Sequence, residues 1–319
     1  MSNVRDEILY ELVIGEPILI DKNAFIPLKN EEERSIFIQD FYDRNDANAY
    51  LFNQHQIIFK VNMSSVNEHA NNASIKVWNL DDDVVEYLVN NQGNRLALAL
   101  SAGDNVQGLK EIFLGSIEKV TVEEQGEDRV ITLIVLDGIT QIKNAKSVRR
   151  WPRGTPYQTI INDLSNDMKV PVNRMAVIEG FTEEPITLMG PTFRLMHDQL
   201  RKLGFSYSID KGLASILPLN KRISKEVSYI TPESGLIGKV TDYVDEKNNT
   251  ASTSTPDSKG IQFTCLLDGN LAPDETVYVK EGKFDGAYKI TDIRISGNYE
   301  GGDWTCNVIA IETEGEIVL

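Results

Sequence analysis

The sequence has few of the side chains on which metal and catalytic sites depend. It contains two cysteines and three histidines in 319 residues. No pair among His55, His69 and His197 has the i, i+4 spacing of a helical zinc site. No apolar run approaches the roughly 20 residues of a membrane span, and the charged segment Met1–Glu11 does not resemble a signal peptide. We therefore expect neither a zinc site, nor membrane insertion by this chain, nor export.

The two cysteines, Cys265 and Cys306, lie in alternating apolar patterns. A buried thiol behaves as a small hydrophobic side chain, and disulfide frameworks are typical of small secreted domains. Both cysteines are therefore predicted to be reduced core residues.

Basic residues are also scarce, since 32 Lys and Arg face 48 Asp and Glu for a formal net charge of −16. Such a surface disfavours tight binding to the nucleic acid backbone. A local exception is the basic strap, defined as Lys143 to Arg153, which contains five basic residues around Trp151. Two interpretations stay open for the strap: contact with a phosphate or an acidic neighbouring subunit, or a solvated linker.

Alternating hydrophobicity predicts a β-rich first part of the chain. The expected strands are Ser35–Phe41, Gln56–Asn62, Ala73–Leu80, Arg95–Leu100, Ile112–Val122 and Arg129–Leu136. One short helix should follow the acidic cap Asp81–Asp83.

Residues from about 146 onward change in composition and predict helices. Thr155 and Gln158 have the spacing of a capping box for a helix ending near Met168. A second helix is expected from Pro191 to Gly204, and a hairpin should join Phe205–Ile209 to Leu213–Leu219.

The last part of the chain returns to strands separated by glycine-rich turns. The expected strands are Leu236–Val244, Ile261–Leu267, Thr276–Lys280, Ala287–Ser296 and Trp304–Glu312, the last three forming an antiparallel meander. The polar stretch 247–259 predicts a mobile loop.

These patterns predict a mainly β protein with a small α/β insert. The expected domains are 1–145, a β domain with one short helix; 146–222, a small α/β domain; and 223–319, a β-barrel-like domain. No convincing sequence repeat links the two β parts.

No catalytic, cofactor or metal site is predicted. Gly235–Lys239 resembles the end of a phosphate-binding loop, but Glu233 and Val240 stand where glycine and a hydroxyl residue are required. The acidic clusters Glu31–Glu33, Asp81–Asp83 and Glu123–Glu124 lack the pattern of a Ca²⁺ loop, and no nucleophile elbow occurs. We expect a non-enzymatic protein.

A resemblance covers much of the chain. Residues 284–312, which contain a glycine-rich turn and the step Gly302-Asp303-Trp304, follow Leu271–Val279. The upstream segments that match are Ala73–Leu80, Leu96–Ala102 and Glu111–Val120. In this order they resemble baseplate hub proteins of contractile-tailed bacteriophages, which are related to the hub half of type VI secretion spike proteins.

The resemblance implies two tube-like antiparallel β-barrel or sandwich domains flanking the helix-containing middle domain. It implies a virion protein of the tail baseplate that is present in the host cytoplasm during assembly. The implied homotrimer adapts a sixfold tail tube to a threefold spike. Its partners would be the spike protein, a tail tube or tube-initiator protein, and the tape measure protein and other baseplate subunits. DNA would pass through a central channel without specific binding, and the acidic balance suggests a channel surface that repels phosphate.

Two other classes stay open. A carbohydrate-binding or adhesin-type tail module requires aromatic residues on an exposed sheet face, for which Trp304, Tyr299 and Tyr288 are candidates. A cell-wall hydrolase requires a carboxylate pair, which the fold rather than sequence spacing would bring together.

Overall fold

The structure is a computed structural model that describes residues 7–15, 49–66, 70–94, 96–137, 144–223, 228–244 and 259–317. Outside these ranges lie the expected strand Ser35–Phe41, most of the loop 247–259, Lys143, His69 and Glu31–Glu33.

The N-terminal β region contains β1 (Ile8–Gly15), β2 (Ala49–Phe52), β3 (Ile57–Ser64), β4 (Asn72–Trp78), α2 (Asp82–Asn90), β5 (Ala97–Asp104), β6 (Gly108–Gln125) and β7 (Asp128–Leu136).

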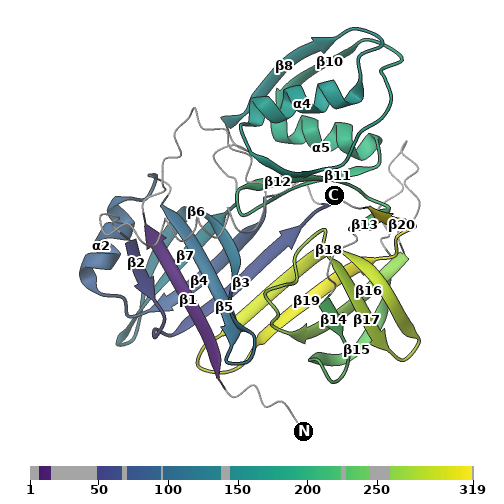
Figure 1. The fold of residues 1–319 in the computed structure, drawn as a ribbon. Coiled ribbons are helices and arrows are strands. Elements are labelled where there is room, and N and C mark those ends of the chain that lie inside the picture. The colour runs from purple at the N-terminus through teal and green to yellow at the C-terminus, as the bar shows by residue number, and fades with distance from the viewer. Residues whose placement is uncertain are drawn as a thin grey trace.

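A middle region and a C-terminal β region follow (Figure 1). The middle region contains β8 (Lys146–Trp151), α4 (Tyr157–Met168), β9 (Val172–Met175), β10 (Ile186–Pro191), α5 (Thr192–Lys202), β11 (Phe205–Asp210) and β12 (Leu213–Pro218). The C-terminal β region contains β13 (Lys221–Ile223), β14 (Ser228–Ile230), β15 (Leu236–Val244), β16 (Lys259–Leu266), β17 (Thr276–Glu281), β18 (Phe284–Asn298), β19 (Trp304–Ile311) and β20 (Gly315–Ile317). The protein is mainly β with a small helical part, as the sequence predicts.

The two β regions share one sheet. Its central strands, named here the central sheet, run in the order β15-β16-β19-β18-β3-β4-β7-β6. The junction is the antiparallel pair of β18 and β3, in which Asp292 to Asn298 align with Ser64 to Ile58. Figure 1 shows the yellow C-terminal strands running beside the blue N-terminal ones at this seam. Hydrogen bonds between backbones therefore join the regions edge to edge.

The two β regions also have the same topology, although their sequences show no repeat. In chain order the first contains β3, β4, β5, β6 and β7, and these pair in the spatial order β3-β4-β7-β6-β5. The second contains β15 to β19, paired as β15-β16-β19-β18, with β17 on β18. The long strands β6 and β18 each shift register against the strand that follows them, near Ile117 and Ile290, as at a β-bulge. Each region is therefore the same five-strand unit, placed head to tail with the other.

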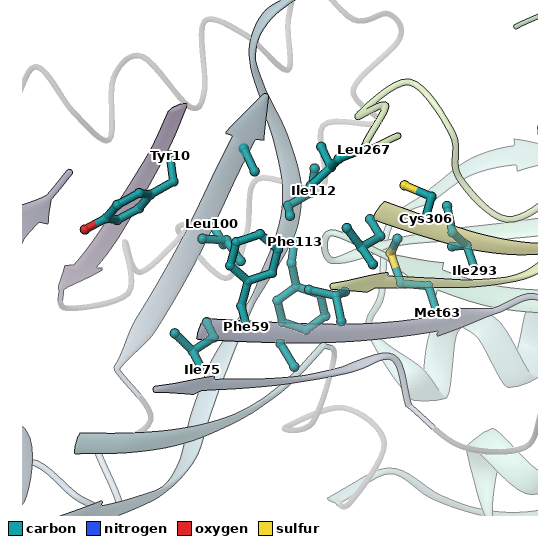
Figure 2. Close-up of a cluster of buried hydrophobic side chains, with 14 of the residues drawn as sticks. Tyr10, Phe59, Met63, Ile75, Leu100, Ile112, Phe113, Leu267, Ile293 and Cys306 are labelled. Atoms are coloured by element: carbon teal, nitrogen blue, oxygen red, sulfur yellow. The ribbon is translucent and has the colours of Figure 1, made fainter. Parts of the chain in front are cut away.

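One hydrophobic cluster contains buried side chains from both β regions and packs against one face of the shared sheet. Figure 2 shows Met63 of β3 and Ile293 of β18 together with Cys306 of β19, with Phe113 of β6 close by. Cys306 lies opposite Cys265 in the β16–β19 pair, and both thiols are buried and reduced, as predicted. The seam is thus a packed core as well as a hydrogen-bonded ladder.

The middle region has its own hydrophobic cluster. Helices α4 and α5 lie between the β8–β10 pair and the β11–β12 hairpin (Figure 1). Helix α5 occurs where Phe193, Met196 and Leu200 predict it, and all three are buried. His197 of the same helix is buried beside Phe193. The reason is that it follows Phe193 by one helical turn on the packed face.

Some local predictions need correction. The capping box at α4 does not form, because Thr155 Oγ1 donates to the carbonyl of Pro152 and Gln158 Oε1 accepts from the amide of Ile178. The segment Ile8–Gly15, for which no strand is expected from the sequence, forms β1 between β5 and β2. None of the described helices is both long and apolar enough to cross a membrane.

Candidate assembly surfaces

Within the described residues, the central sheet has one covered face and one bare face. Alternate residues such as Phe59, Ile75 and Ile293 point into the shared core. The positions between them place polar side chains on the opposite face, for example Lys60, Asn62 and Arg294. A hollow of about 540 Å³ lies on this face at the seam. It is lined by Asn62, Met63, Ser64, Ala70, Asn71, Asn72, Gln262, Asp292, Ile293, Arg294, Asn307 and Ile309.

The bare face does not share the acidic balance of the whole chain. In the three rows of aligned residues that contain Lys60, Lys76, Lys119 and Arg294, the other positions are serine, threonine, asparagine and aliphatic residues. Among the described residues, the carboxylates on this face are Glu118, which is the extra residue of the β6 bulge beside Lys119, and those of the flanking rows, such as Asp292 and Glu123. The expectation of an acidic, phosphate-repelling surface is therefore not met on this face of the sheet.

Among the described strands, neither end of the central sheet has a further neighbour. Strand β15 pairs with β16 and with no other described strand. Residues 119–125 of β6 pair with β7 on one side, and β5 covers only the first half of that strand. Val122 and Val244 lie on the core side of these ends, yet they are 37% and 52% exposed. Exposed strand edges with apolar side chains are typical sites of pairing with another chain.

Most of the described part of the basic strap is a strand and not a solvated linker. Residues Lys146–Trp151 form β8, which pairs with β10. Arg149 makes a bidentate ion pair with Asp167 of α4, with nitrogen–oxygen distances of 2.7 and 2.8 Å. Hydrogen bonding by Arg149 lowers the pKa of the Asp167 carboxyl. Trp151 Nε1 donates to Asp163 of the same helix at 2.8 Å. The two acids that these strap residues contact thus lie in the same region of the chain.

The β11–β12 hairpin of the middle region straddles the seam. At its turn, the amides of Lys211 and Gly212 donate to Asp137 at the end of β7. Burial, and then the neighbouring charge of Asp210, raise the pKa of Asp137 well above its usual range. Asn71 Nδ2 donates to the carbonyl of Ile209 at 2.8 Å. These contacts fix one end of the hairpin to the N-terminal β region.

The other end of the hairpin is fixed to the C-terminal β region by a buried ion pair. Lys289 Nζ lies 3.0 Å from Asp274 Oδ1, and both side chains are 1% exposed. Lys289 also donates to the carbonyl of Pro218, and the hydroxyls of Ser206 and Ser208 donate to Asp274. The hairpin therefore connects both β regions through polar groups that are fully removed from water.

One buried polar group in the middle region is unsatisfied. Tyr207 is 1% exposed, and its hydroxyl has no hydrogen-bond partner in the described part of the chain. We expect Tyr207→Phe to leave the free energy of unfolding unchanged or to raise it by up to about 1 kcal/mol, because an unpaired buried hydroxyl opposes folding. Urea unfolding measures this change.

Tyr10 offers the matched control for that substitution. Its hydroxyl donates to the carbonyl of His55 at 2.6 Å, so Tyr10→Phe should cost about 1 kcal/mol. A larger loss for Tyr207→Phe than for Tyr10→Phe would contradict the assignment of Tyr207 as unpaired.

The residues considered for other functions lie apart. No group of three His, Cys, Asp or Glu side chains that could hold a metal ion occurs among the described residues. Asp82 pairs with Arg129, and Glu123 and Glu124 lie exposed near the end of β6. The described acidic clusters thus lie at a helix start and at a hairpin end.

The aromatic residues considered for glycan binding pack inward. Trp304 contacts Phe59 edge to face and donates to the carbonyl of Gly103. Tyr288 is buried, and Tyr299 packs against Tyr10 at a centroid distance of 4.9 Å. They form no exposed aromatic platform, which removes the observation that suggested a glycan-binding module.

Comparisons with known proteins place the fold. No protein-family model and no curated protein sequence matches the chain. The 43 kDa tail protein of prophage MuSo2 from Shewanella oneidensis aligns over 82% of this chain and 96% of its own, with a TM-score of 0.58 and 8% identity. The tail protein from Neisseria meningitidis MC58 aligns over 82% and 94%, with a TM-score of 0.57 and 9% identity.

A type VI secretion protein has the same fold. The E. coli protein c3393, a component of that system with structural similarity to the T4 bacteriophage tail proteins gp27 and gp5, aligns over 82% of this chain and 75% of its own. Its TM-score is 0.55 at 9% identity. The chain therefore has the fold that phage tail proteins share with a type VI secretion component, as the resemblance in its sequence predicts.

Proposed function

We propose that the protein is a structural component of a phage tail baseplate, a hub that forms a ring of three copies. The ring would adapt a sixfold tail tube to a threefold spike, and its neighbours would be the spike, the tube or its initiator, the tape measure protein and other baseplate subunits. This role requires no catalysis and locates the protein in the virion. In this proposal the functional domains are 1–145, 146–222 and 223–319.

The observation that carries the proposal is the head-to-tail seam. Within one chain, β18 of the second unit pairs with β3 of the first unit. The strand that matches β18 in the first unit is β6, and the strand that matches β3 in the second unit is β15. Among the described strands, β15 has no neighbour on its outer edge, and neither does β6 over residues 119–125. If β6 of one copy pairs with β15 of the next, the contact inside the chain is repeated between chains.

Such a contact is heterologous, and heterologous contacts close into rings when the rotation permits. Three copies of a chain with two matched units would supply six units, which suits a sixfold tube. The core face of the central sheet is covered by β5 and the strands beyond it, so the bare polar face is the one available to line a central channel for DNA.

The mass in solution tests the ring. Light scattering over a concentration series should give three times the 35.8 kDa chain mass. Val122→Glu should shift the protein toward monomer, because it places a carboxylate on the open β6 edge where the partner strand would bury it. Val148→Glu, at a 75% exposed apolar position on β8, is the control and should leave the mass unchanged.

Either of two outcomes would contradict the ring. A stable dimer would, because twofold pairing leaves the head-to-tail contact unused. Equal loss of assembly in Val148→Glu and Val122→Glu would also do so, since the interface would then not lie at the strand edge.

A further inference from the structure

The bare face of the central sheet carries a band of cations that is unusual for so acidic a chain. The band is defined as Lys60, Lys76, Lys119 and Arg294, which are all exposed. Strand register places Lys60 diagonally next to Lys76 on β4 and diagonally next to Arg294 on β18. Diagonal neighbours in an antiparallel sheet are about 7–8 Å apart. Three positive charges therefore gather at the seam.

Three of the four cations have no acidic partner in the part of the chain that the structure describes. Among the described residues, no carboxylate lies within ion-pair distance of Lys60, Lys76 or Arg294, whereas basic residues such as Arg149, Arg174 and Lys289 are paired. Like charges at this spacing repel one another, and a bound anion would offset this repulsion. The acidic residues on the face are Glu118, which is exposed next to Lys119 in the β6 bulge, and Asp292 and Glu123 in the flanking rows.

The shape of the band favours an extended anion. From Lys119 on β6 to Arg294 on β18 it crosses four strand spacings, a distance of about 19 Å. Between the cations lie Ser74, Asn62 and Asn72, whose hydroxyl and amide groups suit phosphate oxygens. A small ion would need only one part of such a surface.

The band is poorly suited to a protein partner. Protein interfaces depend on exposed apolar or aromatic anchors near their centre. The apolar residues among these cations, Ile58 and Ile134, are half-buried between neighbouring side chains. The surface thus offers charge and hydrogen bonds without an anchor, which is typical of contact with a nucleic acid backbone.

We infer that this band contacts the phosphates of DNA, weakly and without reading its sequence. The inference rests on the proposed function only in placing the face inside a channel, because the band itself lies within one chain. A channel lined by this band would differ from one that only repels DNA. The cations at the seam would attract the duplex and hold it away from the acidic remainder of the protein.

Binding of a fluorescein-labelled 30-base-pair duplex, followed by anisotropy at about 20 mM NaCl, tests the inference. The full chain should bind, and affinity should fall steeply as salt is raised, because phosphate contacts release counterions. Lys60→Glu/Lys76→Glu/Arg294→Glu should bind at least about tenfold more weakly. The milder Lys60→Gln/Lys76→Gln/Arg294→Gln should show a smaller loss and guards against misfolding of the first variant.

The matched control is Lys146→Glu/Arg150→Glu/Arg153→Glu, which makes the same change in net charge at exposed positions of the middle region. It should bind like the unmodified chain. Equal weakening in the control, or no binding by the unmodified chain, would overturn the inference. Competition by poly-glutamate as effective as that by unlabelled duplex would also overturn it, in favour of an acidic protein.

Light scattering on the same samples separates this inference from the ring. A monomer whose DNA binding depends on Lys60, Lys76 and Arg294 would contradict the ring but support the band. A trimer that does not bind DNA would do the reverse.

Discussion

Lys289→Met should lower the free energy of unfolding by about 3–5 kcal/mol, because it leaves the Asp274 carboxylate buried without its counter-charge. The hydroxyls of Ser206 and Ser208 would remain, but they supply hydrogen bonds and no charge. Urea unfolding of the variant and the unmodified chain measures the loss.

A second ion pair in the same region provides the control. Lys283 pairs with Asp242, and their side chains are 68% and 65% exposed. Lys283→Met should cost less than about 1 kcal/mol, since water screens an exposed pair. Lys289→Met/Asp274→Asn should recover part of the loss, because asparagine is neutral and tolerates the positive φ of 68° at position 274. Equal losses for Lys289→Met and Lys283→Met would show that burial of the first pair has no energetic consequence.

Gly297→Ala should cost about 3 kcal/mol or more, through overpacking at the seam. Gly297 of β18 is aligned with Phe59 of β3, and the ring of Phe59 covers the glycine. An added Cβ would lie 2.1 Å from Cζ of that ring. The ring has little room to move, because it is fully buried and packs edge to face on Trp304.

Gly286→Ala on the same strand is the control. Its Cβ would have no neighbour closer than 3.8 Å, so a small effect is expected. Phe59→Leu combined with Gly297→Ala should be less destabilised than the sum of the two single variants, because the smaller side chain relieves the contact. Strictly additive losses would mean that the contact with Phe59 is not the cause.

Local signals in the sequence explain which elements could be predicted. Helix α5 has a clear apolar period and a glycine after its end, Gly204, with a φ of 79°. The β17–β18–β19 meander has glycine-rich turns between alternating strands. The β11–β12 hairpin has Lys211 and Gly212 at its turn, both with positive φ, as a two-residue turn requires.

No local sequence signal predicts the assembly surfaces. The seam joins residues 58–64 to residues 292–298, and nothing local to either strand specifies the other. The shared topology of the two β regions could not be predicted from the sequence, because the regions have the same strand order but different residues. The charge band was hidden for a similar reason, since register alone brings Lys60, Lys76 and Arg294 together from three strands.

The basic strap shows the limit of reading charge from composition. Five basic residues close together suggested a linker or an anion site. Strand alternation separates them, so that Arg149 turns inward to Asp167 while Lys146 and Arg150 stay exposed. Only the position of α4 behind the strand determines which of them is paired.

The seam also determines the order in which the chain can fold. Strand β3 is synthesised early, but its neighbour β18 follows roughly 230 residues later. At about 5–20 residues per second, the edge of β3 waits on the order of 10–50 s on the ribosome. During this interval the middle region, whose hydrophobic cluster is local, gains all its partners. Contacts so distant in sequence form slowly, so completion of the central sheet should be a late, post-translational step, and an unpaired β3 is the point at which nascent chains would aggregate.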